Sequence, residues 1–371
     1  MMGWMDAVPL WDHHCHALLR EEERDNLEAL ARCLTEAPLD YPLRDIKKTV
    51  VYQEALAVAA QELGTQPEEE PLRRALRAAD YRAYCRRLLQ NAGYGRLYID
   101  TGYTPAQAWS LTELQEVLGI SVYPILRLET TAEWCLRQSG SFEEWRTLFI
   151  QQVSQARQSG YRGAKSIVAY RSGLHIMPVD EGTASRRWEE MRQLGQQRLQ
   201  HAELLNYLVH LATPLLIQQQ LPLQFHTGYG DPDTDLLQGN PLLLRAYLET
   251  YAQQDHRVVL LHTYPYQREA GYLTSVYRGV YADVSLALPL AASGAVRILH
   301  ELLELAPLSR VLFASDSHSR PESYALAGQF FREGMDRFLS RVVGAHQVRA
   351  SVAADWAEAV SFRNAEALYG T

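Results

Sequence analysis

The chain has 371 residues and is 47% hydrophobic, enough apolar material for either two ordinary domains or one large α/β barrel. Its formal net charge of -8 argues against a nucleic-acid-binding surface, which needs clustered basic residues. The chain has no apolar run of about 18 residues and no signal-peptide pattern at its amino terminus, so we expect a cytoplasmic protein without a membrane span.

Eight short runs rich in β-branched and aromatic residues, each bounded by turn-forming residues, predict eight strands. In chain order they are Pro9–His16, Arg96–Asp100, Ser121–Arg127, Gly163–Tyr170, Leu221–His226, Arg257–His262, Val280–Val284 and Arg310–Asp316. Segments with helical spacing lie between them: Phe142–Arg157, the stretch around Leu204–Leu211, Pro241–Gln254 and Val296–Leu305. Alternating strands and helices predict a parallel sheet, and eight repeats favour a (β/α)8 TIM barrel over an open sheet.

The segment between the first two predicted strands is unusually long. It runs over residues 18–95, whereas a simple barrel unit takes roughly 30 residues. Its composition is helical and rich in charge. We therefore interpret residues 1–371 as a single barrel with a helical insertion at 18–95. The insertion leaves the catalytic end of the barrel, so it either caps the active site or packs along the side.

Five residues at the carboxyl ends of the predicted strands suggest a metal site. His14 and His16 are two apart, and on a strand such residues point to the same face. His226, His262 and Asp316 end three further strands, and all such ends meet at one mouth of a barrel. Four imidazoles and one carboxylate suit Zn²⁺ best, with Mn²⁺ and Fe²⁺ as alternatives.

Three residues beside these histidines have predicted supporting roles. Asp12 either orients a ligand histidine or satisfies polar groups inside the barrel. His13 points to the opposite face and is interpreted as structural. Cys15 also points away from the site and packs into the barrel wall. The spacing of the four cysteines fits neither a disulfide framework nor a zinc ribbon.

These motifs resemble the amidohydrolase superfamily along nearly the whole chain. The resemblance is carried by Asp12-x-His14-x-His16, Phe225–Gly228, Leu261-His262, Ser315-Asp316 and the closing helix Asn364–Tyr369. Ala164–Leu174 and His226–Asp231 are similar to the nodulin-type branch, in which the domain is found fused to a glutamine-synthetase-like domain. We expect no such fusion in this chain.

The resemblance implies a metal-activated water that attacks the substrate. Asp316 would take a proton from this water and pass it to the leaving group, and His262 would bind a second metal or polarise the substrate. The resemblance leaves three roles for Lys165: a carboxylated bridge between two metals, a substrate or supporting contact, or a structural residue. One or two ions are therefore expected.

The remaining candidates follow strand ends and should line the mouth. For substrate binding these are Arg127, Tyr170, Arg171, Tyr264 and His318. Either arginine can hold a substrate carboxylate with two hydrogen bonds or pair with a nearby acidic side chain.

The sequence thus predicts a metal-dependent hydrolase that cleaves an amide or related C–N bond in a small, anionic molecule. One alternative is a metal-dependent decarboxylase on the same barrel. Another is a metal-binding regulatory protein without catalytic activity, although such a protein has no need of the full ligand set. We expect a small-molecule substrate and no nucleic-acid or membrane partner, and homo-oligomerisation stays open.

Overall fold

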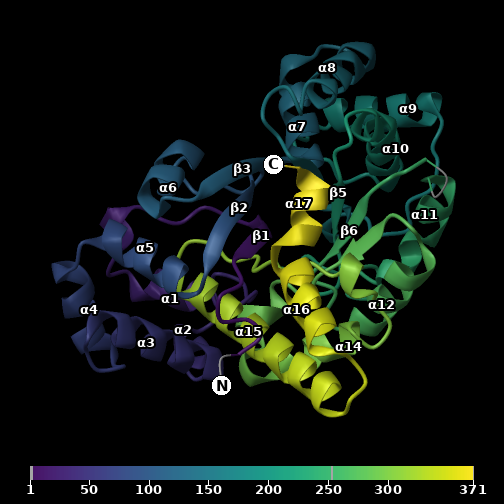
Figure 1. Ribbon diagram of the computed structural model, residues 1–371. Coiled ribbons are helices and arrows are strands. Elements are labelled where there is room, and N and C mark those ends of the chain that lie inside the picture. Colours follow the sequence, from purple (N-terminus) through teal and green to yellow (C-terminus); the bar gives the residue numbers. More distant parts are fainter. Residues whose placement is uncertain (1–2, 252–253, 371) are drawn as a thin grey trace.

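The computed structural model describes residues 3–251 and 254–370. Its centre is a parallel sheet of seven strands, in which neighbours in sequence are neighbours in space (Figure 1). The strands are β1 (Leu10–Cys15), β2 (Tyr94–Asp100), β3 (Ser121–Arg127), β4 (Gly163–Ser166), β5 (Leu223–His226), β6 (Val258–Leu261) and β7 (Val280–Ala282). This sequential order in a curled parallel sheet is that of a TIM-barrel-like fold, as the alternating pattern predicted.

The fourth strand is shorter than predicted. It stops at Ser166 because a buried carboxylate from the neighbouring helix takes over its hydrogen bonds. Glu129 accepts from the Ser166 hydroxyl at 2.6 Å and from the Ile167 amide at 3.0 Å. The chain then turns into a short 3-10 helix at Val168–Tyr170, which carries Tyr170 to the mouth of the barrel.

The eighth predicted strand does not form a regular strand within the described residues. Val311 makes an isolated parallel bridge with Ala282 of β7. On the other side, His13 donates its amide hydrogen to the Phe313 carbonyl at 3.2 Å. Between these contacts the pairing is irregular, because the Ser315 amide donates to the Asp12 carboxylate and not to a backbone carbonyl.

Helices cover the outside of the sheet. Those between the strands are α6 (Leu111–Leu118), α7 (Leu128–Gln138), α8 (Phe142–Ser154), α9 (Glu181–Gln193), α10 (Ala202–Gln218), α11 (Arg245–Tyr251), α12 (Gln267–Val276), α13 (Ala287–Leu290) and α14 (Ala295–Leu302). After the last strand-like run come α15 (Pro321–Gly344), α16 (Ala350–Glu358) and α17 (Asn364–Tyr369). The predicted helix Pro241–Gln254 is a 3-10 turn followed by α11, and its residues 252–253 lie outside the described part of the chain.

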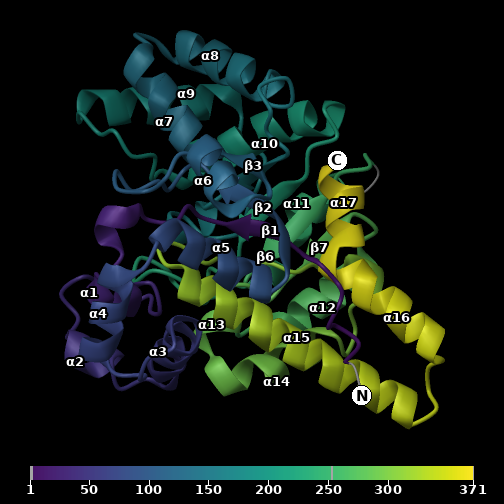
Figure 2. The same cartoon turned by 60° about the vertical axis from the view of Figure 1, so that its left-hand side comes forward.

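Five helices lie between β1 and β2. They are α1 (Leu27–Arg32), α2 (Leu43–Ile46), α3 (Val50–Leu63), α4 (Glu69–Ala78) and α5 (Tyr81–Asn91). They gather on the left of the molecule in Figure 1, and in Figure 2 α1 to α4 lie at the lower left with α5 nearer the centre. Arg320, at the start of α15, holds this group in place by donating to the carbonyls of Glu23 and Arg24 at 2.9 Å each.

Alternation along the strands divides the core in two. In β6, Val258 and Leu260 face the helices, whereas Val259 and Leu261 face the interior of the sheet. The interior cluster is completed by α17, whose Tyr369 is 1% exposed. Each such fully buried apolar side chain contributes roughly 1.5–3 kcal/mol. The amino ends of the strands are therefore sealed, and polar interior residues occupy the opposite end. None of the helices in residues 3–251 and 254–370 has the length and apolarity to cross a membrane.

Candidate metal centre

Three predicted ligands converge in the structure: His14, His16 and Asp316. Asp316 Oδ1 lies 3.0 Å from His14 Nε2 and 3.3 Å from His16 Nε2, and the three candidate donor atoms all lie within 4.8 Å of one another. Metal–nitrogen bonds of 2.0–2.1 Å at tetrahedral angles would separate ligand atoms by about 3.3 Å. The spacing therefore suits ligands of one ion.

A backbone seam holds the two ligand-bearing segments together. The Asp316 amide donates to the His14 carbonyl at 3.0 Å, and the His16 amide donates to the Ser317 carbonyl at 2.9 Å. Buried Asp12 reinforces the seam by accepting from the amides of His14 and Ser315 at 3.2 and 3.1 Å. Of its two predicted roles, the structure shows hydrogen bonding to backbone inside the barrel. Burial raises the pKa of the Asp12 carboxyl to about 8.

Gln224 determines which nitrogen of His14 carries the proton. Its Oε1 lies 3.0 Å from His14 Nδ1, while its Nε2 donates to the His13 carbonyl and the Tyr369 hydroxyl at 2.9 and 2.8 Å. Oε1 must then accept, so His14 is protonated at Nδ1 and its Nε2 presents a lone pair to Asp316. This lone pair faces both Asp316 Oδ1, at 3.0 Å, and the Nζ of Lys165, at 2.8 Å. The sequence analysis did not identify Gln224, whose only signal was its inward position two residues before His226.

Burial sets the protonation states that a metal needs. It lowers the pKa of His14 to about 4, with the charge of Lys165 adding to the effect, and lowers the pKa of His226 and His262 well below the ordinary value. Burial alone would raise the pKa of Asp316, but the adjacent histidines outweigh it and hold that pKa well below its usual range. Neutral imidazoles and an ionised carboxylate are the forms that bind divalent metals.

His226 and His262 lie beside the three converging donors. His262 Nδ1 is 2.8 Å from the Ser285 hydroxyl, which itself donates to Asp283, so His262 is protonated at Nδ1. Its Nε2 is buried without a hydrogen-bond partner, and Nδ1 lies 3.6 Å from Asp316 Oδ2. His226 directs Nε2 to the Tyr229 carbonyl at 3.0 Å, and its ring is tilted against that of His262, with 4.5 Å between the ring centroids. His13 was expected to point to the opposite face, but its ring also lies inside the sheet, because the register of β1 shifts between Asp12 and Cys15. There it contacts the Tyr369 hydroxyl at 3.0 Å and Asp283 at 2.8 Å, so neither partner belongs to the three converging donors.

Lys165 lies directly against the centre. Its Nζ is 2.8 Å from His14 Nε2 and 3.4 Å from Asp100 Oδ2. Asp100 also pairs with Arg127, and these cations hold its pKa below the usual range despite its burial. The sequence analysis overlooked Asp100 as a site residue, although it ends the second predicted strand.

The other predicted mouth residues divide into two groups. The rings of Tyr170 and His226 lie against each other, with 4.1 Å between their centroids. The ring of Tyr103 lies between those of His318 and His16, at centroid distances of 5.9 and 5.4 Å. Tyr264 packs against Tyr229, with 5.4 Å between the two ring centroids.

Arg171, by contrast, is bound elsewhere: its Nη1 donates to the Glu133 carboxylate and to the Leu199 carbonyl. Arg127 is held by Asp100, with its Nε 3.1 Å from Oδ2. Each arginine expected to bind a substrate carboxylate thus already has an acidic partner.

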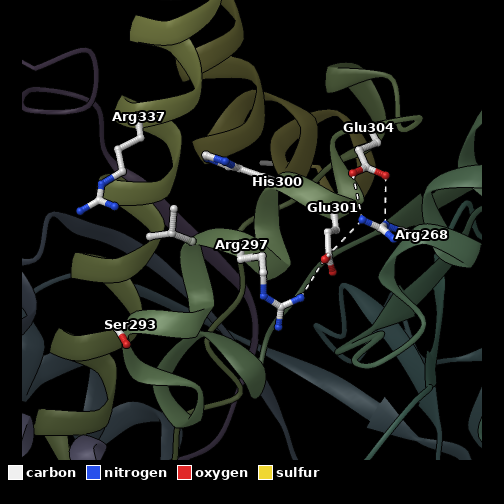
Figure 3. A pocket seen from close by; sticks show the side chains of 8 residues that line it. Arg268, Ser293, Arg297, His300, Glu301, Glu304 and Arg337 are labelled. Carbon is white, nitrogen blue, oxygen red and sulfur yellow. Dashed lines mark hydrogen bonds and ion pairs between the residues drawn. The ribbon is translucent and has the colours of Figure 1, made fainter.

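A pocket on the outer surface has a different character (Figure 3). It lies at α12, α14 and α15, away from the histidine cluster. Arg268 and Arg297 both pair with Glu301, and Arg337 pairs with Glu333. Since its arginines are all matched by glutamates, this pocket has no unpaired charge for a ligand, and the catalytic candidate is the histidine cluster.

Comparison with known proteins agrees with this geometry. An amidohydrolase family model matches residues 200–371. A candidate metal-dependent hydrolase from Lactobacillus casei ATCC 334 has 39% identity and a TM-score of 0.93, covering 99% of this chain and 96% of that protein. Protein fluG of Emericella nidulans is 35% identical over 220 residues, which are 56% of this chain and 25% of fluG. The chain thus spans about a quarter of that relative.

More distant structures share the fold alone. Uronate isomerase from Thermotoga maritima has 13% identity and a TM-score of 0.66, with 99% of this chain and 95% of that one covered. Glucuronate isomerase from Caulobacter crescentus has 14% identity and a TM-score of 0.67, with 99% and 92% covered.

Proposed function

Because the chain belongs to the amidohydrolase family, we propose that it is a metal-dependent hydrolase that cleaves an amide or related C–N bond in a small molecule. The observation that carries the proposal is the convergence of His14, His16 and Asp316, whose donor atoms all lie within 4.8 Å of one another. His14, His16 and Asp316 would hold the ion, with Zn²⁺ the first choice for nitrogen-rich ligands. When bound, such an ion supplies Lewis acidity and lowers the pKa of water toward 7.

The residues around the ion would transfer the proton and line the substrate cavity. Asp316 has a second oxygen, Oδ2, that lies on the side of His262, and there it would accept a proton from the attacking water and deliver it to the leaving nitrogen. His262 presents the lone pair of its buried Nε2, so it would accept a hydrogen bond from that water or bind a second ion. Tyr170, stacked on His226, would form one wall of the substrate cavity.

Two architectural features belong to the proposal. We propose that Val311–Asp316 completes a (β/α)8 barrel as an irregular eighth member, since it hydrogen-bonds to β7 through Leu312 and to β1 through Phe313. The insertion at residues 18–95 would cap the mouth. In support, the Glu36 carboxyl, which follows α1, lies close enough to Asp316 and Lys165 for their charges to change its pKa.

Asp316→Asn tests the proposed hydrolysis. The wild type, reconstituted with zinc, should release amine or ammonia from members of a small amide library, and the variant should lose at least about 10³-fold in kcat/KM because it lacks the proton acceptor. Asp233→Asn, in the exposed loop after β5, is a matched control and should keep full activity. Activity retained by Asp316→Asn would refute the proposed role. A parallel set of small carboxylates tests the decarboxylase alternative: release of CO₂ from that set, with no amine released from the amides, would establish it.

A further inference from the structure

The amino-terminal end of the sheet carries arginines that the fold leaves without acidic partners. Four of them lie where strands begin: Arg96 in β2, Arg162 before β4, Arg257 before β6 and Arg310 before Val311. Because the strands are parallel, these positions share one end of the sheet, opposite the histidine cluster. Arg257 donates to the carbonyls of the closing helix, and Arg310 donates to the Tyr281 hydroxyl. A chain with a net charge of -8 thus has uncompensated positive charge at this end.

Arg96 is held by two aromatic rings. Its guanidinium carbon lies 3.7 Å from the centroid of the Trp11 ring and 5.3 Å from that of Tyr123. Trp11 is the partner of Arg96 in the β1–β2 ladder, so the ring and the guanidinium meet across neighbouring strands. Phe362 packs on the Trp11 indole, with 5.7 Å between the rings. Arg96 is therefore positioned by aromatic contacts and not by a carboxylate.

Arg162 lies on the same tyrosine ring. Its guanidinium carbon is 4.9 Å from the Tyr123 centroid. Tyr123 rests in turn on Tyr98, with 5.6 Å between the rings, and fully buried Tyr98 packs on Tyr369 at 4.8 Å. The core of the barrel thus fixes the one ring that brings the two guanidinium groups together.

These two arginines have hydrogen-bonding capacity that the protein does not use. Nη1 of Arg96 and Nε of Arg162 are buried and lack a hydrogen-bond partner among the residues that the structure describes. Both side chains are half-buried, so the rest of each guanidinium reaches solvent. A buried donor of a charged group costs free energy when it stays unpaired. An arginine stacked on an aromatic ring can still offer its N–H fork to a carboxylate or a phosphate.

We infer that Arg96 and Arg162 bind a small multivalent oxyanion, a phosphate or a dicarboxylate, at the amino-terminal end of the barrel. The site does not depend on the proposed function, because the candidate metal ligands lie at the opposite ends of the strands. The arginines at that other end, Arg127 and Arg171, are already paired with carboxylates. Arg96 and Arg162 offer the charge that those residues have already given to an acidic partner.

Calorimetric titration of the full, zinc-loaded chain tests the site with two probes, inorganic phosphate and succinate, at an ionic strength held constant with sodium chloride. At least one probe should bind, and the tighter of the two identifies the ligand as a phosphate or a carboxylate. The Arg96→Gln and Arg162→Gln double variant should bind it at least about ten-fold more weakly, as expected from the loss of charge-assisted hydrogen bonds. Arg74→Gln, at an exposed position on α4, is the control for lost positive charge and should bind like the wild type.

Two further variants separate binding at this site from other effects. Trp11→Phe keeps an aromatic ring beneath Arg96, so it should retain the affinity but lose the change in tryptophan fluorescence that the bound anion causes. Arg162→Gln alone, just before β4, should weaken binding even if the double variant does not fold. Three results would overturn the inference: a wild type that binds neither probe, affinity unchanged in Arg162→Gln, or affinity lost in Asp316→Asn and kept in the arginine variants, which would place the anion at the metal centre.

Discussion

Gln224 accepts a hydrogen bond from His14 at 3.0 Å, and through this contact an uncharged amide sets the tautomer of a candidate metal ligand. Both side chains are fully buried, and the other end of the amide is held by the His13 carbonyl and Tyr369. The orientation of the His14 ring therefore depends on hydrogen bonds that connect it, through Gln224, to Tyr369 at the end of α17.

We predict that Gln224→Leu weakens metal binding by about 10- to 100-fold, the usual cost of removing a hydrogen bond that orients a ligand histidine. Competition with a chelator of known affinity measures it. Gln219→Leu, at the outer end of α10, is the control: it loses hydrogen bonds to backbone but lies away from the histidines. Unchanged affinity in Gln224→Leu would show that the amide does not position His14.

Lys165 allows a prediction about metal stoichiometry. Its Nζ is already engaged by two partners, Asp100 Oδ2 at 3.4 Å and His14 Nε2 at 2.8 Å, which occupy the positions around the nitrogen that a bridging carbamate would need. We therefore predict one ion per chain, by elemental analysis, in both the wild type and Lys165→Met reconstituted in bicarbonate buffer. Two ions in the wild type and one in the variant would instead establish the bridging role.

His256 should make the fold sensitive to acid. Thr213 donates to the Val209 carbonyl and so accepts from Tyr247, whose oxygen must then accept from His256 Nε2. Its buried Nδ1 has no hydrogen-bond partner among residues 3–251 and 254–370, and burial lowers the pKa of this histidine to about 4. In the unfolded chain the pKa of the same imidazole is near 6.5, so the unfolded chain binds the proton first as the pH falls.

The stabilising contribution of neutral His256 is thus complete above about pH 6.5 and is lost as the pH falls toward 4. The loss amounts to about 3 kcal/mol in the free energy of unfolding. Denaturant titrations between pH 7 and pH 4 should show a shallower decline for His256→Gln than for the wild type. His346→Gln, at an exposed position, should decline like the wild type. Parallel curves for His256→Gln and the wild type would disprove the assignment.

The buried Arg320–Glu322 pair should hold the insertion against the barrel. Both side chains are fully buried, with Nη2 of Arg320 2.8 Å from Glu322, and Tyr84 of α5 donates to the same carboxylate at 2.9 Å. Arg320→Met leaves Glu322 buried without its counter-ion, and we predict a loss of about 3–5 kcal/mol in the free energy of unfolding.

The double variant Arg320→Met with Glu322→Met removes both charges and should lose less than the single variant. Hydrogen exchange should report faster opening of α5 and α3 in Arg320→Met. A double variant that is less stable than the single one would show that the pair itself stabilises the protein, beyond balancing a buried charge.

The sequence alone determined the local elements and the order of the sheet. Strand Ser121–Arg127 has the predicted bounds, since the pattern of a strand is a property of neighbouring residues. The pairing of His14 with His16 was also readable, because two positions on one strand must share a face.

Only the tertiary structure decided the partners of these residues. Whether a charged side chain is free or paired depends on residues that the fold brings from far along the chain, as Asp100 does for Arg127 and Glu133 for Arg171. Local pattern places a residue on a face of a strand. Its electrostatic environment depends on all the charged groups that surround it in the folded protein. The character of the substrate site is therefore set by contacts that no short stretch of sequence contains.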